Sequence, residues 1–156
     1  MSGPADPTDA LPEAGGVYVF VMHCGRAFSA RIGALGELGF EPGFYCYVGS
    51  ARAGLRARVC RHLRRGGKRP HWHIDYLRPC VRGVGAMVWP GKDADECVLS
   101  GLVAEKAERS VPNFGCSDCA CGSHLHFTRK HPAELLRQIA PEGARWIAFG
   151  GEDEAT

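Results

Sequence analysis

Three cysteines and two histidines lie within a short stretch of the C-terminal third of the chain: Cys116, Cys119, Cys121, His124 and His126. Thiolates and imidazoles are ligands that zinc prefers, and four such groups can close a tetrahedral site. The cluster is therefore a candidate zinc site, with Cys116, Cys119, Cys121 and His124 as its ligands. The alternative is a loop of reduced cysteines held by backbone hydrogen bonds, with Asp118 or His124 facing a cleft.

Positive charge is concentrated in one fifth of the chain. Of the 19 Lys and Arg residues, ten lie between positions 51 and 82, where Asp75 is the only acid, although the net charge is only +2. A local basic patch favours an anionic partner, most simply nucleic acid. The candidate phosphate contacts are Arg56, Arg61, Arg64, Arg65, Lys68 and Arg69, unless these side chains only face solvent.

The elements that must position these residues begin with three strands. The run from Gly16 to Met22 is rich in β-branched and aromatic residues, which is typical of a buried strand. A second strand is expected around 27–35. After the turn-forming stretch 36–43, the aromatic run 44–49 predicts a third strand. Three consecutive strands indicate an antiparallel sheet.

A basic helix is predicted over residues 52–65. Apolar residues recur every four positions from Leu55 to Leu63 and form one stripe along the helix. Arg58 and His62 are four residues apart, so they lie on the same side of the helix, where they border this stripe.

The remaining predicted elements are a helix at 71–77, a strand at 81–89, a helix capped by Asp93 or Asp95 and running to about 109, a helix at 133–139 and a strand at 145–149. The order βββααβααβ predicts an α+β fold, in which a small antiparallel sheet is flanked by helices and carries an inserted strand and a Cys/His loop.

Length and composition indicate one domain. The chain has 156 residues, 45% of them hydrophobic and 23% charged, which suffices for a core. We expect a single domain at 14–150, between a flexible lead-in at 1–13 and an acidic tail at 151–156. Apolar runs are too short to cross a membrane, so we expect no membrane partner. No signal peptide is recognisable and cysteines are abundant, so we expect a cytoplasmic protein. Four isolated cysteines are interpreted as small core residues: Cys24, Cys46, Cys60 and Cys97.

Two tripeptides on the predicted strands resemble the signature of a known family. Gly16-Val17-Tyr18 and Tyr47-Val48-Gly49, followed by a helix with Arg58 and His62, are similar to the GIY-YIG nuclease superfamily. The long gap between the two tripeptides, and the string FGCSDC followed by SHL within 114–125, resemble the Uri-type endonuclease branch of that superfamily.

The resemblance implies a metal-dependent hydrolysis of phosphodiester bonds. Such a reaction needs a positioned water, a base, and positive charge on the phosphate. By resemblance, Tyr18 is the general base, Tyr47 and His62 position water and phosphate, and Arg58 holds the scissile phosphate through its planar guanidinium.

The resemblance also implies a single Mg²⁺ or Mn²⁺ ion bound by a glutamate on the third helix, with waters completing its oxygen shell. Glu96 and Glu105 are both candidates, and Glu96 is preferred because it opens the helix. An acid at this position could instead only favour the helix dipole. His71, His73 and Asp118 are further candidates for the cleft, although the two histidines could also pack beneath it, with Asp75 capping or pairing locally.

We therefore expect an endonuclease that cleaves DNA with weak sequence specificity, in repair or recombination. A chain of this length leaves little room for a separate DNA-reading domain, so we expect either weak sequence preference or a partner protein that supplies substrate targeting. The alternative is a non-catalytic nucleic-acid-binding module with a zinc-stabilised loop.

Overall fold

The centre of the protein is a six-stranded antiparallel sheet in the order β6-β7-β4-β1-β5-β8. This computed structural model describes residues 6–64, 69–91, 95–116, 121–139 and 142–150. The strands of the sheet are β1 (Gly16–Cys24), β4 (Gly43–Ala51), β5 (Arg82–Pro90), β6 (Arg109–Ser110), β7 (Leu125–Thr128) and β8 (Arg145–Ala148). A separate hairpin consists of β2 (Phe28–Arg31) and β3 (Glu37–Phe40).

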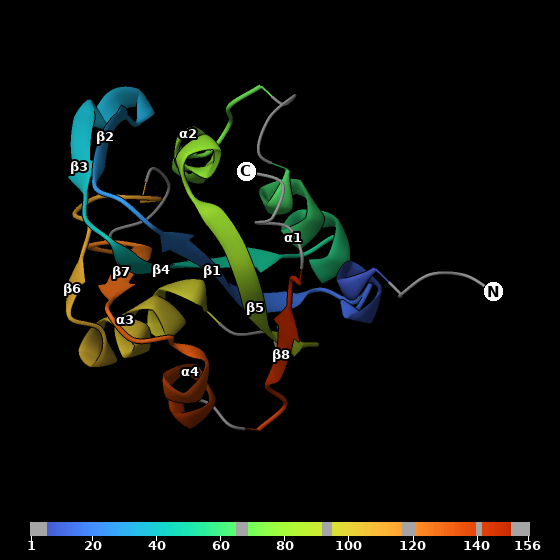
Figure 1. The fold of residues 1–156 in the computed structure, drawn as a ribbon. Helices are drawn as coiled ribbons and strands as arrows, with labels where there is room; N and C mark the ends of the chain where they lie inside the picture. Colours follow the sequence, from blue (N-terminus) through green and yellow to red (C-terminus); the bar gives the residue numbers. More distant parts are fainter. Residues whose placement is uncertain (1–5, 65–68, 92–94, 117–120, 140–141, 151–156) are drawn as a thin grey trace.

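Helices cover both faces of the sheet, which gives three layers (Figure 1). The α-helices are α1 (Leu55–Leu63), α2 (His73–Leu77), α3 (Glu96–Lys106) and α4 (Ala133–Ile139), and short 3-10 helices occur at Pro7–Ala10, Gly33–Leu35 and Arg78–Cys80. The apolar side chains of α1 and α2 belong to one core cluster, and those of α3 and α4 belong to the other. The α+β class with a helix-flanked antiparallel sheet is thus confirmed.

The central strand β1 contributes to both core clusters. Side chains alternate along a strand, so Tyr18 and Phe20 pack on the side of α1 and α2, whereas Val17 and Val19 pack on the side of α3 and α4. Burial on both faces explains why the sequence of this strand is a continuous apolar run.

The inserted segment differs from its prediction. Instead of one strand over 27–35, β2 ends at Arg31, and the chain turns through Gly36, whose φ of 80° is in the region that favours glycine. The stretch expected as a turn then contains β3. The insertion is therefore a hairpin.

Two further differences concern the segment after α3. This helix ends at Lys106, because the backbone of Glu108 already donates to Phe127 O at 2.9 Å. Residues 125–128 of the expected Cys/His loop form β7, which pairs with β4. A four-residue strand is too short to give a clear periodic signal.

The N-terminal segment, for which the sequence predicts flexibility, contacts the rest of the fold through Leu11 and through Arg56. Leu11 is fully buried, and the Arg56 guanidinium donates to Asp9 O, Leu11 O and the Glu13 carboxylate at 2.9–3.0 Å. In the described part of the chain, no helix has the length and apolarity needed to cross a membrane.

Candidate active site

A pocket of about 500 Å³ lies where β1, β4, α1 and the start of α3 meet. Its lining includes the side chains of Tyr18, Tyr47, Arg58, His62, Trp72 and Glu96. The structure thus brings together five residues that the sequence predicts for the site, although they come from separate segments of the chain.

Tyr18 and His62 form a buried polar pair at the floor of this pocket. The Tyr18 hydroxyl and His62 Nε2 are 2.7 Å apart, and both residues are 1% exposed. Burial raises the pKa of Tyr18 well above its usual range, and the nearby Tyr47 adds to this, while the Arg58 charge lowers it in part. The Tyr18 phenol is therefore neutral at physiological pH.

Gly49 makes room for Tyr18. The two residues are directly opposite each other in the β1–β4 pair, and a Cβ at Gly49 would overlap the Tyr18 hydroxyl. Gly16 is similarly constrained, because a Cβ there would overlap Trp89 O. The glycines of both tripeptides thus have a packing reason for their identity.

Tyr47 lies two residues before Gly49, which is directly opposite Tyr18. Residues two apart on a strand point to the same face of the sheet, so Tyr47 lies on the same face as Tyr18. Its ring packs edge-on against His62, with 5.6 Å between ring centroids. Burial raises the pKa of Tyr47, and the Glu96 carboxylate raises it further. Tyr47 is thus also a neutral phenol.

Arg58 is held at the pocket from two sides. Its Nη1 donates to Ser50 O at 2.9 Å, and its guanidinium carbon lies 4.7 Å above the centre of the Trp72 ring. A guanidinium stacked on an aromatic ring keeps its hydrogen-bonding edge available in one plane. The geometry suits a bidentate contact to an anion in the pocket.

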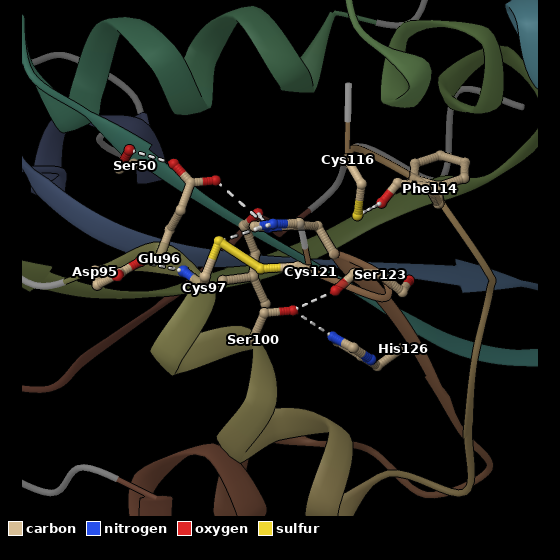
Figure 2. Close-up of a disulfide and its surroundings, with 12 residues drawn as sticks. Ser50, Asp95, Glu96, Cys97, Ser100, Phe114, Cys116, Cys121, Ser123 and His126 are labelled. Carbon is tan, nitrogen blue, oxygen red and sulfur yellow. Dashed lines mark hydrogen bonds and ion pairs between the residues drawn. A yellow bond between two sulfur atoms is a disulfide. The ribbon is translucent and has the colours of Figure 1, made fainter. Parts of the chain in front are cut away.

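Glu96 is the first residue of α3, and its side chain is 37% exposed at the pocket. Oε1 accepts from Ser50 Oγ at 2.6 Å, and Oε2 lies 3.4 Å from His124 Nδ1 (Figure 2). Asp95 caps the helix by accepting from Cys97 N at 2.8 Å, as one of the two predicted caps. Glu105 is exposed near the other end of α3 and does not line the pocket.

The candidate zinc cluster has a different membership from the one that the sequence suggests. Within the described residues, the three groups that could hold a metal ion together are Cys97, Cys121 and His124. Cys97 and Cys121 are joined as a disulfide (Figure 2). The interpretation of Cys97 as a core residue is therefore wrong, because its sulfur faces the segment before β7.

The other predicted members of the cluster lie elsewhere. Cys116 Sγ contacts Phe114 O at 3.5 Å, and Figure 2 shows this sulfur apart from the Cys97–Cys121 pair. Cys119 and Asp118 lie outside the described residues.

His126 is enclosed by hydroxyl groups. Ser100 Oγ donates to Ser123 O at 2.6 Å, so it accepts from His126 Nε2 at 2.7 Å. Nδ1 then accepts from Ser110 Oγ at 2.7 Å. Burial, together with the charge of nearby His124, lowers the pKa of His126 to about 4, so this ring is a neutral structural group.

The predicted cleft histidines lie beside the pocket. Gly115 N donates to His73 Nδ1 at 2.8 Å, which fixes the loop before the Cys/His segment, and burial lowers the pKa of His73. His71 is exposed. Asp75 accepts from the backbone N–H groups of His71 and Trp72 and pairs with Arg61 at 3.2 Å, as the local capping interpretation predicts.

The predicted phosphate contacts divide into engaged and exposed side chains. Arg56 holds the N-terminal segment, and Arg61 pairs with Asp75 and lies 4.6 Å above the Trp72 ring. Arg64 and Arg69 are exposed, whereas Arg65 and Lys68 lie outside the described residues.

Sequence reasoning missed two contributors to the pocket. Trp72 supports Arg58, and Ser50 orients Glu96. Ser50 could have been found from the sequence, because it directly follows Tyr47-Val48-Gly49. The position of Trp72 in the sequence gives no indication that the guanidinium groups of Arg58 and Arg61 stack on its ring.

The chain was compared with known proteins. No curated protein and no solved structure matches it. A family described as "Domain of unknown function DUF123" matches residues 17–144, which include the pocket residues and the Cys97, Cys121 and His124 group. The chain therefore belongs to the DUF123 family.

Proposed function

We propose that this protein is a metal-dependent endonuclease that hydrolyses DNA phosphodiester bonds with weak sequence specificity. The observation that supports this most is the convergence of two tyrosines, an arginine, a histidine and a carboxylate on one pocket. The resemblance to the GIY-YIG nucleases, of the Uri type, implies the same set of residues.

The Tyr18–His62 pair is suited to accept the proton of an attacking water. Because Tyr18 is a neutral phenol, its oxygen can take up a proton only as its own proton leaves. His62 Nε2, 2.7 Å away, is placed to receive that proton. The water then attacks phosphorus, the bond to the leaving oxygen breaks, and His62 afterwards returns the proton to the leaving oxygen or to solvent.

Arg58 is suited to bind the scissile phosphate. Its guanidinium is oriented before substrate arrives by Ser50 O and the Trp72 ring. An arginine positioned in this way neutralises charge on the phosphate oxygens without reorganisation during the reaction. Tyr47 borders the same space and would position water or phosphate.

Glu96 fits the carboxylate of a Mg²⁺ or Mn²⁺ site. A carboxylate offers about four lone-pair positions, of which the Ser50 and His124 contacts take two, and the side chain is partly exposed at the pocket. Mg²⁺ is usually held by one or two carboxylates and keeps several waters. When bound, such an ion supplies positive charge for the phosphate and the leaving oxygen.

A cleavage assay tests this function. End-labelled single-stranded, duplex and branched DNA would be incubated with Mg²⁺, Mn²⁺ or EDTA, using the unmodified protein, Glu96→Gln and Glu105→Gln. We expect cutting that requires the metal, is lost in Glu96→Gln and is retained in Glu105→Gln, which changes an exposed acid on the same helix.

Salt-sensitive DNA binding without cutting on any substrate would contradict the proposal. That outcome would favour the non-catalytic nucleic-acid-binding module instead.

A further inference from the structure

A thiol and imidazole cluster reaches the wall of the pocket, whose lining includes Cys97, but it has no role in the proposed cleavage reaction. Cys97 is in the first turn of α3, and Cys121 and His124 lie in the segment before β7. Their ligand atoms are all within 4.8 Å of one another. The cluster thus joins two segments that are 24 residues apart in sequence.

The orientation of His124 points to a metal ligand. Its Nδ1 lies 3.1 Å from Val48 O. Since a carbonyl oxygen only accepts, Nδ1 carries the proton, and Nε2 presents its lone pair to Cys97 Sγ at 3.8 Å. Histidines that bind metals through one nitrogen usually donate from the other to a carbonyl or a carboxylate, and Glu96 Oε2 is 3.4 Å from Nδ1.

One of the ligand-atom distances, from Cys97 Sγ to His124 Nε2, can be compared directly with that of a tetrahedral ion, whereas the two sulfurs would have to separate on reduction of the disulfide. With Zn–S near 2.3 Å and Zn–N near 2.0–2.1 Å, the sulfur and nitrogen of a tetrahedral site are about 3.6 Å apart. The Cys97 Sγ to His124 Nε2 distance of 3.8 Å is close to this value.

We propose that Cys97, Cys121 and His124, when the two cysteines are reduced, bind one zinc ion through both sulfurs and His124 Nε2. The two thiolates and one imidazole are soft and intermediate ligands, which favour zinc over Mg²⁺. This second metal site is separate from the proposed Mg²⁺ or Mn²⁺ site at Glu96.

The disulfide and the zinc ion exclude each other, because a sulfur bonded to sulfur carries no thiolate charge. Reduction by a phosphine or a dithiol adds two electrons and two protons and yields two thiols, while the reductant is oxidised. Zinc then replaces the two thiol protons. The ion would fix the first turn of α3, which includes Glu96, to the segment before β7.

Cobalt binding tests the site without reference to nuclease activity. The full chain would be reduced with a phosphine under anaerobic conditions and titrated with Co²⁺, with absorption recorded for thiolate-to-cobalt charge transfer. The variants are Cys97→Ser and two controls, Cys80→Ser at an exposed free cysteine and Cys116→Ser at the sulfur beside Phe114.

We expect one Co²⁺ per chain, with a charge-transfer band that Zn²⁺ abolishes by displacement and that both control variants keep. Cys97→Ser should weaken Co²⁺ binding by more than the roughly 10–100-fold that loss of an outer-shell partner costs. A reduced protein without the band, or a band that survives Cys97→Ser but is lost in Cys116→Ser, would overturn the proposal.

Alkylation mapping provides a readout on the unmodified chain, in case Cys97→Ser does not fold. In the reduced chain, stoichiometric Zn²⁺ should protect Cys97 and Cys121 from a thiol reagent, while exposed Cys80 stays reactive. Equal labelling of Cys97 and Cys121 with and without Zn²⁺ would also overturn the proposal.

Discussion

The Tyr18 hydroxyl and His62 Nε2 are joined across 44 residues of sequence by a buried 2.7 Å hydrogen bond. The contact connects the central strand β1 to helix α1 at the pocket, where both side chains are almost fully covered. A buried phenol beside an imidazole gives a path for a proton that neither group offers alone.

Replacing Tyr18 by Phe removes the hydroxyl and keeps the ring. If the proton passes through this oxygen, cleavage should slow by about 10²–10⁴-fold, the usual contribution of an acid–base group. Stability should fall by about 1–3 kcal/mol, because the buried His62 Nε2 loses this hydrogen bond. Single-turnover rates and denaturant unfolding would measure the two effects.

Tyr45→Phe is the matched control for this variant. Tyr45 is also buried and its hydroxyl also forms hydrogen bonds, but to the Glu41 backbone and away from the pocket. We expect a similar stability change and no change in the cleavage rate. Equal rates for both variants would remove the Tyr18 hydroxyl from the reaction.

Gly49→Ala should displace the Tyr18 ring, because the added Cβ would overlap its hydroxyl. Overpacking of a core position costs about 1–3 kcal/mol, so both unfolding free energy and cleavage should fall. The control is Gly39→Ala in β3, where a Cβ would meet its nearest atom, Ser29 Oγ, at 3.9 Å. A Gly49→Ala protein as stable and active as the original would contradict the packing argument.

The strands and helices that carry the pocket could be predicted because their patterns are local. The apolar run of β1 and the four-residue spacing on α1 each reflect burial of the residues concerned. Tyr18, Tyr47, Arg58 and His62 could be chosen by their resemblance to a known signature, and the structure brings all four to one pocket.

The remaining features depend on contacts between distant segments. Cys97 stands singly in a predicted helix, and its sulfur meets Cys121 only because β7 pairs beside β4. Trp72 supports Arg58 only because the residue before α2 lies beside α1 in the fold. No local periodicity or spacing specifies such pairings.

Arg58→Lys should impair cleavage although the charge is kept. Lysine lacks the planar guanidinium that stacks on Trp72 and forms paired hydrogen bonds to a phosphate. Loss of one such donor set costs about 10²–10³ in rate. The measurement is the single-turnover rate at saturating DNA.

Arg64→Ala is the control for Arg58→Lys, because Arg64 is an exposed cation just after the same helix. The Arg64→Ala variant should bind DNA more weakly, and its affinity should depend less on salt concentration. Its cleavage rate at saturating DNA should stay unchanged. Full turnover by Arg58→Lys at saturating DNA would exclude a paired phosphate contact.

The buried ring of His126 predicts a loss of stability in mild acid. Its pKa falls from the ordinary 6.5 to about 4 in the folded protein, mainly through burial, so between these values the unfolded chain binds more protons. Stability contributed by the neutral ring is complete above pH 6.5 and is lost as the pH falls toward 4. At 1.36 kcal/mol per pKa unit, the loss is about 3 kcal/mol.

Unfolding free energies measured between pH 4 and 7.5, for the unmodified chain and His126→Gln, would check this. The variant loses stability at neutral pH, because the hydrogen bonds with Ser100 and Ser110 are disturbed. Its stability should nevertheless depend less on pH, by an amount that approaches the full contribution of His126. Three other histidines with lowered pKa values remain in both proteins, namely His23, His73 and His131. Their contribution to the pH dependence of stability therefore cancels in the comparison. Parallel pH profiles for the two proteins would show that His126 is not the group that titrates.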